Sequence, residues 1–95
     1  MKAYFIGQIT IINTEGYSKY ISKVPNIVAE FGGKYLVRGG NSAQIEGISH
    51  GERIVVIEFP NRIQAKAWYY SDSYQKIIFH RLNNSTGDLV LVDGI

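Results

Sequence analysis

One arginine in this 95-residue chain stands where it could hold a negatively charged ligand. Arg38 ends a run of strand-forming residues and is followed directly by Gly39 and Gly40. A guanidinium group binds carboxylates and phosphates through its planar pair of N–H donors. The two glycines beside it leave room for a ligand, because they carry no Cβ. The chemistry expected at this point is anion binding, although a β-bulge would also explain the glycine pair.

Glu58 is the carboxylate expected beside Arg38. If the hairpin between their two predicted strands turns about Ser49, the two side chains become diagonal neighbours on one face of the sheet. One interpretation is a purely structural ion pair. The other is a pair that also faces a ligand pocket, where it would polarise a substrate oxygen or move a proton. The sequence leaves both interpretations open.

Aromatic side chains with polar edges are frequent enough to build a pocket. The chain has seven Tyr, four Phe and one Trp, and such side chains often line small-molecule sites. Tyr20, Trp68 and Tyr69 are the candidates, since each falls in a predicted helix. The same residues could instead fill the core between helices and sheet. Arg81, in the last predicted helix, is either a second anion anchor or a solvent-exposed charge near a helix end.

Metal and cofactor chemistry has little support in the sequence. The chain has no cysteine and two histidines, His50 and His80, which are far apart. Two isolated ligands do not make a metal site. No phosphate loop, dinucleotide fingerprint or nucleophile elbow occurs either. We therefore expect no metal and no cofactor.

The charge balance argues against a nucleic-acid partner. Ten Lys and Arg against eight Asp and Glu give a net charge of +2, which is too small for an electrostatic footprint. Residues 4–9 resemble the first-strand motif of RNA-recognition domains. Residues 53–57, however, are mostly aliphatic where those domains need aromatics that stack bases. RNA binding is therefore only a remote alternative.

The spacing of apolar residues predicts the elements that carry these side chains. Alternating or β-branched runs predict strands, and apolar residues three and four apart predict helices. Pro25 predicts a kink or a fresh start in the first helix, and Gly32 with Gly33 ends it. The strands expected are 2–12, 34–38 (which can resume over 43–46), 53–59 and 86–92. The helices expected are one from 13 or 14 to 31 and a helical region at 61–82 in two pieces. Ile63, Ala67 and Trp68 form the apolar edge of the first of these two pieces.

This β-α-β-β-α-β order predicts an α+β chain with the ferredoxin-like fold, a four-stranded antiparallel sheet with helices on one face. The length fits one domain over residues 1–95. Residues 54–57 and 89–92 are apolar on both faces of their strands, whereas helices can cover only one. We therefore expect a second copy to cover the other face, giving a homodimer. A strongly curled sheet is the alternative.

Ordered motifs run along nearly the whole chain. They are KYLVRGG at 34–40, IEG at 45–47, RIVVIEFP at 53–60 and AWYYS at 67–71, followed by Tyr74 and Gln75. Together they resemble an uncharacterised bacterial family, the domain-of-unknown-function family 1330 of the dimeric α+β-barrel superfamily. The resemblance implies a subunit whose sheet pairs with a twin to close a barrel. It implies no established activity, and relatives at superfamily level include cofactor-free monooxygenases, haem-degrading enzymes, lactone isomerases and stress-response proteins.

Two functions are therefore expected as alternatives. The first is a homodimer that binds a small anionic or aromatic metabolite in a cleft between helices and sheet. The second is a cofactor-independent enzyme of the monooxygenase or isomerase type. The absence of a signal-peptide pattern and of a membrane-length apolar run predicts a cytoplasmic protein without a membrane partner. The pocket candidates are Arg38, Glu58, Trp68, Tyr20, Tyr69 and Arg81.

Overall fold

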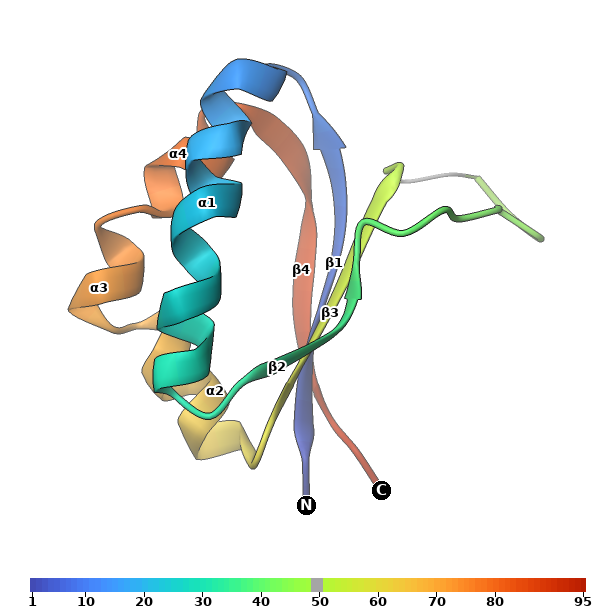
Figure 1. Ribbon diagram of the computed structural model, residues 1–95. Coiled ribbons are helices and arrows are strands. Elements are labelled where there is room, and N and C mark those ends of the chain that lie inside the picture. The colour runs from blue at the N-terminus through green and yellow to red at the C-terminus, as the bar shows by residue number, and fades with distance from the viewer. Residues whose placement is uncertain (49–50) are drawn as a thin grey trace.

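The computed structural model describes residues 1–48 and 51–95, which contain four strands and four helices. The strands form one sheet, and the helices lie on one of its faces (Figure 1). None of the helices in these residues combines the length and the apolar character needed to cross a bilayer. In chain order the elements are β1 (Ala3–Ile11), α1 (Thr14–Glu30), β2 (Lys34–Arg38), β3 (Arg53–Phe59), α2 (Arg62–Tyr69), α3 (Asp72–Gln75), α4 (Ile78–Leu82) and β4 (Ser85–Asp93).

The sheet has the strand order β2-β3-β1-β4, and all neighbouring strands are antiparallel. This order confirms the expected ferredoxin-like α+β fold. Successive side chains of a strand point to opposite faces, and every second residue of β1 from Ala3 to Ile9 is buried. The sheet's half of the core consists of side chains on the helix-covered face: Ala3, Phe5, Ile9, Ile57 and Phe59.

α1 supplies much of the other half of the core. Its buried residues follow the helical spacing read from the sequence: Tyr17, Tyr20, Val24 and Val28. The side chain of Asn13 caps the helix by accepting a hydrogen bond from the Gly16 N–H at 3.1 Å. Gly32 has φ +77°, and a Cβ on Gly33 would lie 2.7 Å from Val28. Both glycines are therefore needed where the chain leaves the helix and turns into β2.

Pro25 lies inside α1 without interrupting it, so the fresh start expected there does not occur. Proline has no N–H, so the carbonyl of Ile21, four residues earlier, lacks its helical donor. Arg38 Nη2 donates a hydrogen bond to this Ile21 oxygen at 2.7 Å. A side chain from β2 therefore replaces the hydrogen bond that the proline removes, and it connects α1 to the sheet.

The second helical region forms three short helices rather than two pieces, because the part after Ser71 divides into α3 and α4. The side chains of Asn61 and Ser71 cap α2 and α3 by accepting hydrogen bonds from the N–H groups of Gln64 and Tyr74. Ala65 and Trp68 face the core, whereas Ile63, expected on the apolar edge, is 79% exposed. Ile63 lies about 200° around the helix from Ala65, since each residue turns about 100°.

β2 pairs with β3 in a register that contradicts the expected contact between Arg38 and Glu58. Lys34 is opposite Glu58, and Arg38 is opposite Val55. The register shifts between Tyr35 and Val37, and residues 43–46 form no strand. The connection is thus a long loop and not a tight hairpin, so its midpoint does not set the register. Ser49, about which the hairpin was assumed to turn, lies outside the described residues.

The two side chains also lie on opposite faces of the sheet. Arg38 shares the helix-covered face with Val55 and reaches Ile21 of α1. Glu58 stands between the buried residues Ile57 and Phe59 in β3, so it faces the other way. There it pairs with Lys2, whose Nζ lies 3.3 Å from Glu58 Oε1. The prediction of a functional or structural Arg38–Glu58 pair is therefore wrong.

The face of the sheet away from the helices is apolar and uncovered in the single chain (Figure 1). Val37, Val90 and Val92 are 39%, 55% and 43% exposed on it. Ile6 and Val56, which pair with one another across β1 and β3, lie at its centre and are partly exposed. The strands are therefore apolar on both sides, and the helices cover only one. We call this surface the bare face.

Candidate functional site

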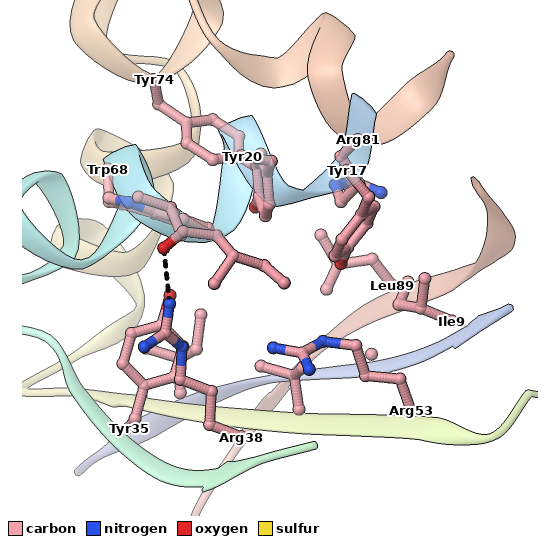
Figure 2. Close-up of a pocket in the computed structure, with 15 residues that line it drawn as sticks. Ile9, Tyr17, Tyr20, Tyr35, Arg38, Arg53, Trp68, Tyr74, Arg81 and Leu89 are labelled. Atoms are coloured by element: carbon pink, nitrogen blue, oxygen red, sulfur yellow. Dashed lines mark hydrogen bonds between the residues drawn. The ribbon is translucent and has the colours of Figure 1, made fainter. Parts of the chain in front are cut away.

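A narrow pocket lies between α1 and the sheet, with the remaining helices around it (Figure 2). Its volume is about 30 Å³, which is the space of about one or two water molecules. Its walls are mainly aromatic and aliphatic, and its charged side chains are all arginines. The lining residues are Gly7, Ile9, Tyr17, Tyr20, Ile21, Val24, Tyr35, Arg38, Arg53, Val55, Ile57, Trp68, Tyr74, Arg81 and Leu89.

Three of the chain's four arginines line this pocket. Arg38 and Arg53 extend from the sheet toward the helices, and Arg81 approaches from α4 (Figure 2). Each guanidinium carbon lies near a tyrosine ring: Arg38 is 4.8 Å from the centroid of Tyr35, Arg53 is 5.8 Å from Tyr17, and Arg81 is 6.0 Å from Tyr20. The tyrosine rings partly stabilise these charges through cation–π contact.

Arg53 is positioned by the glycine that follows β2. Gly39 has φ +70°, and a Cβ at this position would collide with Nη1 of Arg53. The Gly39 N–H donates to the carbonyl of Ile54 at 2.8 Å, which holds the turn against β3. By contrast, a Cβ on Gly40 would meet nothing within 4 Å. Gly39 thus leaves space for a protein side chain and not, as expected from the sequence, for a ligand.

Several buried donors at the pocket have no hydrogen-bond acceptor. Arg53 Nε, Arg81 Nε and Trp68 Nε1 are buried, and none has a partner in the described part of the chain. No carboxylate lines the pocket. The ion pairs within residues 1–48 and 51–95 are Lys2–Glu58 and Arg62–Asp93, both away from it. The pocket is therefore rich in cationic donors that lack a counter-charge.

A pair of tyrosine hydroxyls lies on the helical side of the pocket. The hydroxyl oxygens of Tyr20 and Tyr74 are 2.7 Å apart and buried. Burial is the main cause that raises the pKa of both, and the proximity of Tyr74 raises the pKa of Tyr20 further. Burial likewise raises the pKa of Tyr35 to about 12, although Arg38 lowers it in part. These phenols are protonated near neutral pH, and the hydroxyl that accepts within the pair keeps its own proton to donate.

The structure brings together four of the six residues expected at the site. Arg38, Tyr20, Trp68 and Arg81 line the pocket. Glu58 lies on the bare face beside Lys2. Tyr69 stacks on Phe5, with ring centroids 5.9 Å apart, and lines a separate hollow beside α2 and β4.

Four pocket residues were not predicted as site residues: Arg53, Tyr17, Tyr35 and Tyr74. A signal for Arg53 was present, since it alternates with Val55, Ile57 and Phe59 and must share their face. Tyr17 stands three residues before Tyr20 in α1, which places both on one helical face. Tyr74 stands seven residues before Arg81, a spacing that places both on one helical face. Tyr35 could be assigned only once the register of β2 was known.

Within the described residues, no histidine lines the pocket. His80 lies in α4 and is not among its lining residues. His50 lies outside the described residues. Within residues 1–48 and 51–95, no three His, Asp or Glu side chains gather as metal ligands would.

Solved structures of low sequence identity share this fold. A protein of unknown function from Rhodopseudomonas palustris superposes with a TM-score of 0.81 at 14% identity, over 99% of this chain and 82% of that one. SnoaB, a cofactor-independent oxygenase from Streptomyces nogalater, gives a TM-score of 0.71 at 9% identity, over 99% and 93%. An antibiotic biosynthesis monooxygenase gives 0.57 at 11% identity, over 100% and 99%. At these identities the likeness establishes the ferredoxin-like fold alone.

Sequence comparison gives the family. No curated protein matches the chain significantly. The family described as "Domain of unknown function (DUF1330)" matches residues 2–95, which is nearly the whole chain and confirms the resemblance seen in the ordered motifs. The chain therefore belongs to the DUF1330 family.

Proposed function

We propose that this protein is a homodimer that binds a small anionic or aromatic metabolite in the pocket between α1 and the sheet. The observation that carries the proposal is the set of three pocket arginines, two of them half-buried (Arg53 and Arg81), with no carboxylate among the lining residues. Burying a charge is costly unless it is paired. Cation–π contact with the tyrosines offsets only about 0.5–2 kcal/mol for each arginine. An anionic ligand would supply the missing counter-charge.

Entry of a metabolite requires the pocket to widen, because about 30 Å³ is too small for one. Arg38 is the side chain best placed to move. It is the exposed member of the three arginines, and one hydrogen bond to Ile21 holds its guanidinium over the pocket. Rotation of this side chain into solvent would break that hydrogen bond and the cation–π contact with Tyr35, and it would open the space between β2 and α1.

The bare face supports the dimer. It carries Val37, Val90 and Val92 in exposed positions, with Ile6 and Val56 between them. The molecule measures 31 × 31 × 17 Å, so its broad face matches the area of about 800 Å² that each partner buries in a standard interface. The resemblance of the sequence motifs to the dimeric α+β-barrel superfamily implies the same pairing of sheets. A second copy of this chain is the partner that satisfies both observations.

A ligand screen with a pocket variant tests the binding function. Metabolites that raise the melting temperature of the wild-type protein should lose most of this effect in Arg53→Met, which removes a pocket cation and keeps the side-chain volume. Arg62→Met is the matched control, because Arg62 pairs with Asp93 outside the pocket. If no anionic or aromatic compound stabilises the wild type, or if the stabilisation persists in Arg53→Met, the proposed function is wrong.

A cofactor-independent oxygenase is the second candidate, favoured by the fold shared with SnoaB. Against the oxygenase stands the lack of a general base, since no His, Asp or Glu lines the described pocket. Burial also raises the pKa of the pocket residues Tyr20 and Tyr74, which keeps both phenols protonated. Oxygen uptake by the protein in the presence of any stabilising compound distinguishes the two candidates. Uptake lost in Arg53→Met would favour the enzyme, and binding without uptake would favour the binding protein.

A further inference from the structure

We infer that the pocket is a carboxylate site, in which Arg53, Arg81 and the Tyr20–Tyr74 hydroxyl pair hold the carboxylate of a planar organic acid and Arg38 moves aside for the organic body. This inference rests on the proposed function and narrows it to one chemical class. In this inference the anion is bound by Arg53 and Arg81, whereas the sequence analysis expected Arg38 to bind it.

The balance of donors and acceptors gives the charge of the ligand. Arg53 Nε and Arg81 Nε are buried donors without partners, and arginine has no acceptor atoms. The Tyr20–Tyr74 pair has one hydroxyl proton more than its internal hydrogen bond uses. A ligand that completes these interactions must bring acceptors and a negative charge, because an unpaired buried donor costs about 1–3 kcal/mol.

The shape of the pocket favours a carboxylate over a phosphate. The volume of about 30 Å³ suits a flat group of three heavy atoms better than a tetrahedral dianion. Tyr17, Tyr35 and Trp68 add aromatic walls, against which a planar ring can stack or pack edge-on.

Arg38 differs from the other two arginines in being already satisfied. Its Nη2 donates to Ile21 O at 2.7 Å, and its side chain is exposed. Arg53 and Arg81 are half-buried, and they approach the pocket from opposite sides, one from β3 and one from α4 (Figure 2). An anion between them would relieve the repulsion of two like charges, which Arg38 can avoid by turning into solvent.

Trp68 provides a direct readout, because it is the chain's one tryptophan and lines the pocket. We suggest titrating the wild-type protein with benzoate, with its uncharged analogue benzamide, and with inorganic phosphate, while following Trp68 fluorescence. The Nε–H NMR signals of Arg53 and Arg81 would be recorded in parallel. Benzoate should change all three signals saturably. Benzamide should bind at least roughly tenfold more weakly, as expected for loss of a hydrogen bond to a charged group. Phosphate should also bind more weakly, because it has no planar ring to pack against the aromatic walls.

Variants separate the roles of the arginines. Arg53→Gln and Arg81→Gln should each weaken benzoate binding roughly 10- to 100-fold, whereas Arg38→Gln should change it less than about threefold. Arg62→Gln is the control outside the pocket and should leave it unchanged. If either pocket variant fails to fold, the comparison of benzoate with benzamide on the wild type still decides the question.

Each alternative result has a defined meaning. Equal binding of benzamide would overturn the carboxylate site while leaving a binding pocket in place. If phosphate binds more strongly than benzoate, the pocket is a site for an inorganic or phosphorylated anion, and the carboxylate site is overturned as well. Loss of binding only in Arg38→Gln would return the anchor to Arg38 and contradict the inference. If no probe changes Trp68, the inference fails, and the wider metabolite screen decides separately whether the proposed function fails with it.

Discussion

Arg38 of β2 donates a hydrogen bond to the carbonyl oxygen of Ile21 in α1 at 2.7 Å. This is the carbonyl that Pro25 deprives of its helical donor. Because Pro25 has no N–H, the Ile21 carbonyl is left free to accept the hydrogen bond from Arg38 beside the pocket. A helix defect and a pocket arginine are thus parts of one structural unit.

A double-mutant cycle tests this unit. Arg38→Ala alone should lower the free energy of unfolding by about 1 kcal/mol, because Ile21 O loses its partner. In a Pro25→Ala background the residue-25 N–H can bond to Ile21 O, so the same change should cost less by about 0.5–1 kcal/mol. Urea denaturation of the four proteins gives the coupling. Strictly additive effects would show that Arg38 does not compensate for the proline.

The two glycines after β2 should respond differently to alanine. Gly39→Ala should destabilise the protein by about 1–2 kcal/mol, because φ is +70° and the new Cβ meets Arg53. Gly40→Ala is the matched control and should change stability by less than about 0.5 kcal/mol, since nothing lies within 4 Å. Thermal unfolding measures both. Similar effects at the two positions would refute the packing described for Arg53.

Stability should fall at alkaline pH through the buried tyrosines. Burial raises the pKa of Tyr20, Tyr35 and Tyr74 in the folded protein, while unfolded tyrosines ionise near about pH 10. The folded state then holds more protons, so its stability is complete below about pH 10 and is lost as pH rises toward the folded pKa, about 12 for Tyr35. Urea unfolding at neutral and alkaline pH should show this loss.

Tyr35→Phe checks which group is responsible, because it removes one titrating phenol and keeps the ring against Arg38. Its stability should decline less with rising pH than that of the wild type. An unchanged pH profile in this variant would mean that Tyr35 ionises alike in the folded and unfolded chains.

If two chains pack through their bare faces, a charge placed on this face should separate them. Val90 is 55% exposed on the bare face, so Val90→Asp should leave the fold of one chain intact and separate the dimer. Ile63→Asp is the control, because Ile63 is 79% exposed on α2, on the opposite side of the molecule. Sedimentation should give twice the 10.7 kDa chain mass for the wild type and the control, and a folded monomer for Val90→Asp. A monomeric wild type would contradict the dimer.

The sequence predicted the fold well because the determining signals were local. The caps Asn13, Asn61 and Ser71 and the glycines after α1 mark element ends through interactions within a few residues. The pattern of β3 likewise identified a strand with two apolar faces.

The site was less predictable, because it depends on the register of β2 against β3. A shift at Tyr35 and Val37 and a long connection place Arg38 opposite Val55, and no local pattern encodes that pairing. Arg81 and Tyr74 reach the pocket from two separate helices, α4 and α3, into which the last helical region divides. Non-local geometry of this kind appears only when the chain is folded.

The most direct test of ligand binding in the pocket is a titration of the wild-type protein and Arg53→Met with the best-stabilising metabolite, followed at the Trp68 indole N–H signal. The indole nitrogen is buried and has no acceptor in the described residues. Its N–H chemical shift should therefore respond when a ligand enters the pocket beside it. The account predicts a saturable shift in the wild type that is weakened roughly tenfold or more in the variant. A Trp68 signal that no metabolite moves, or that moves equally in both proteins, would contradict it.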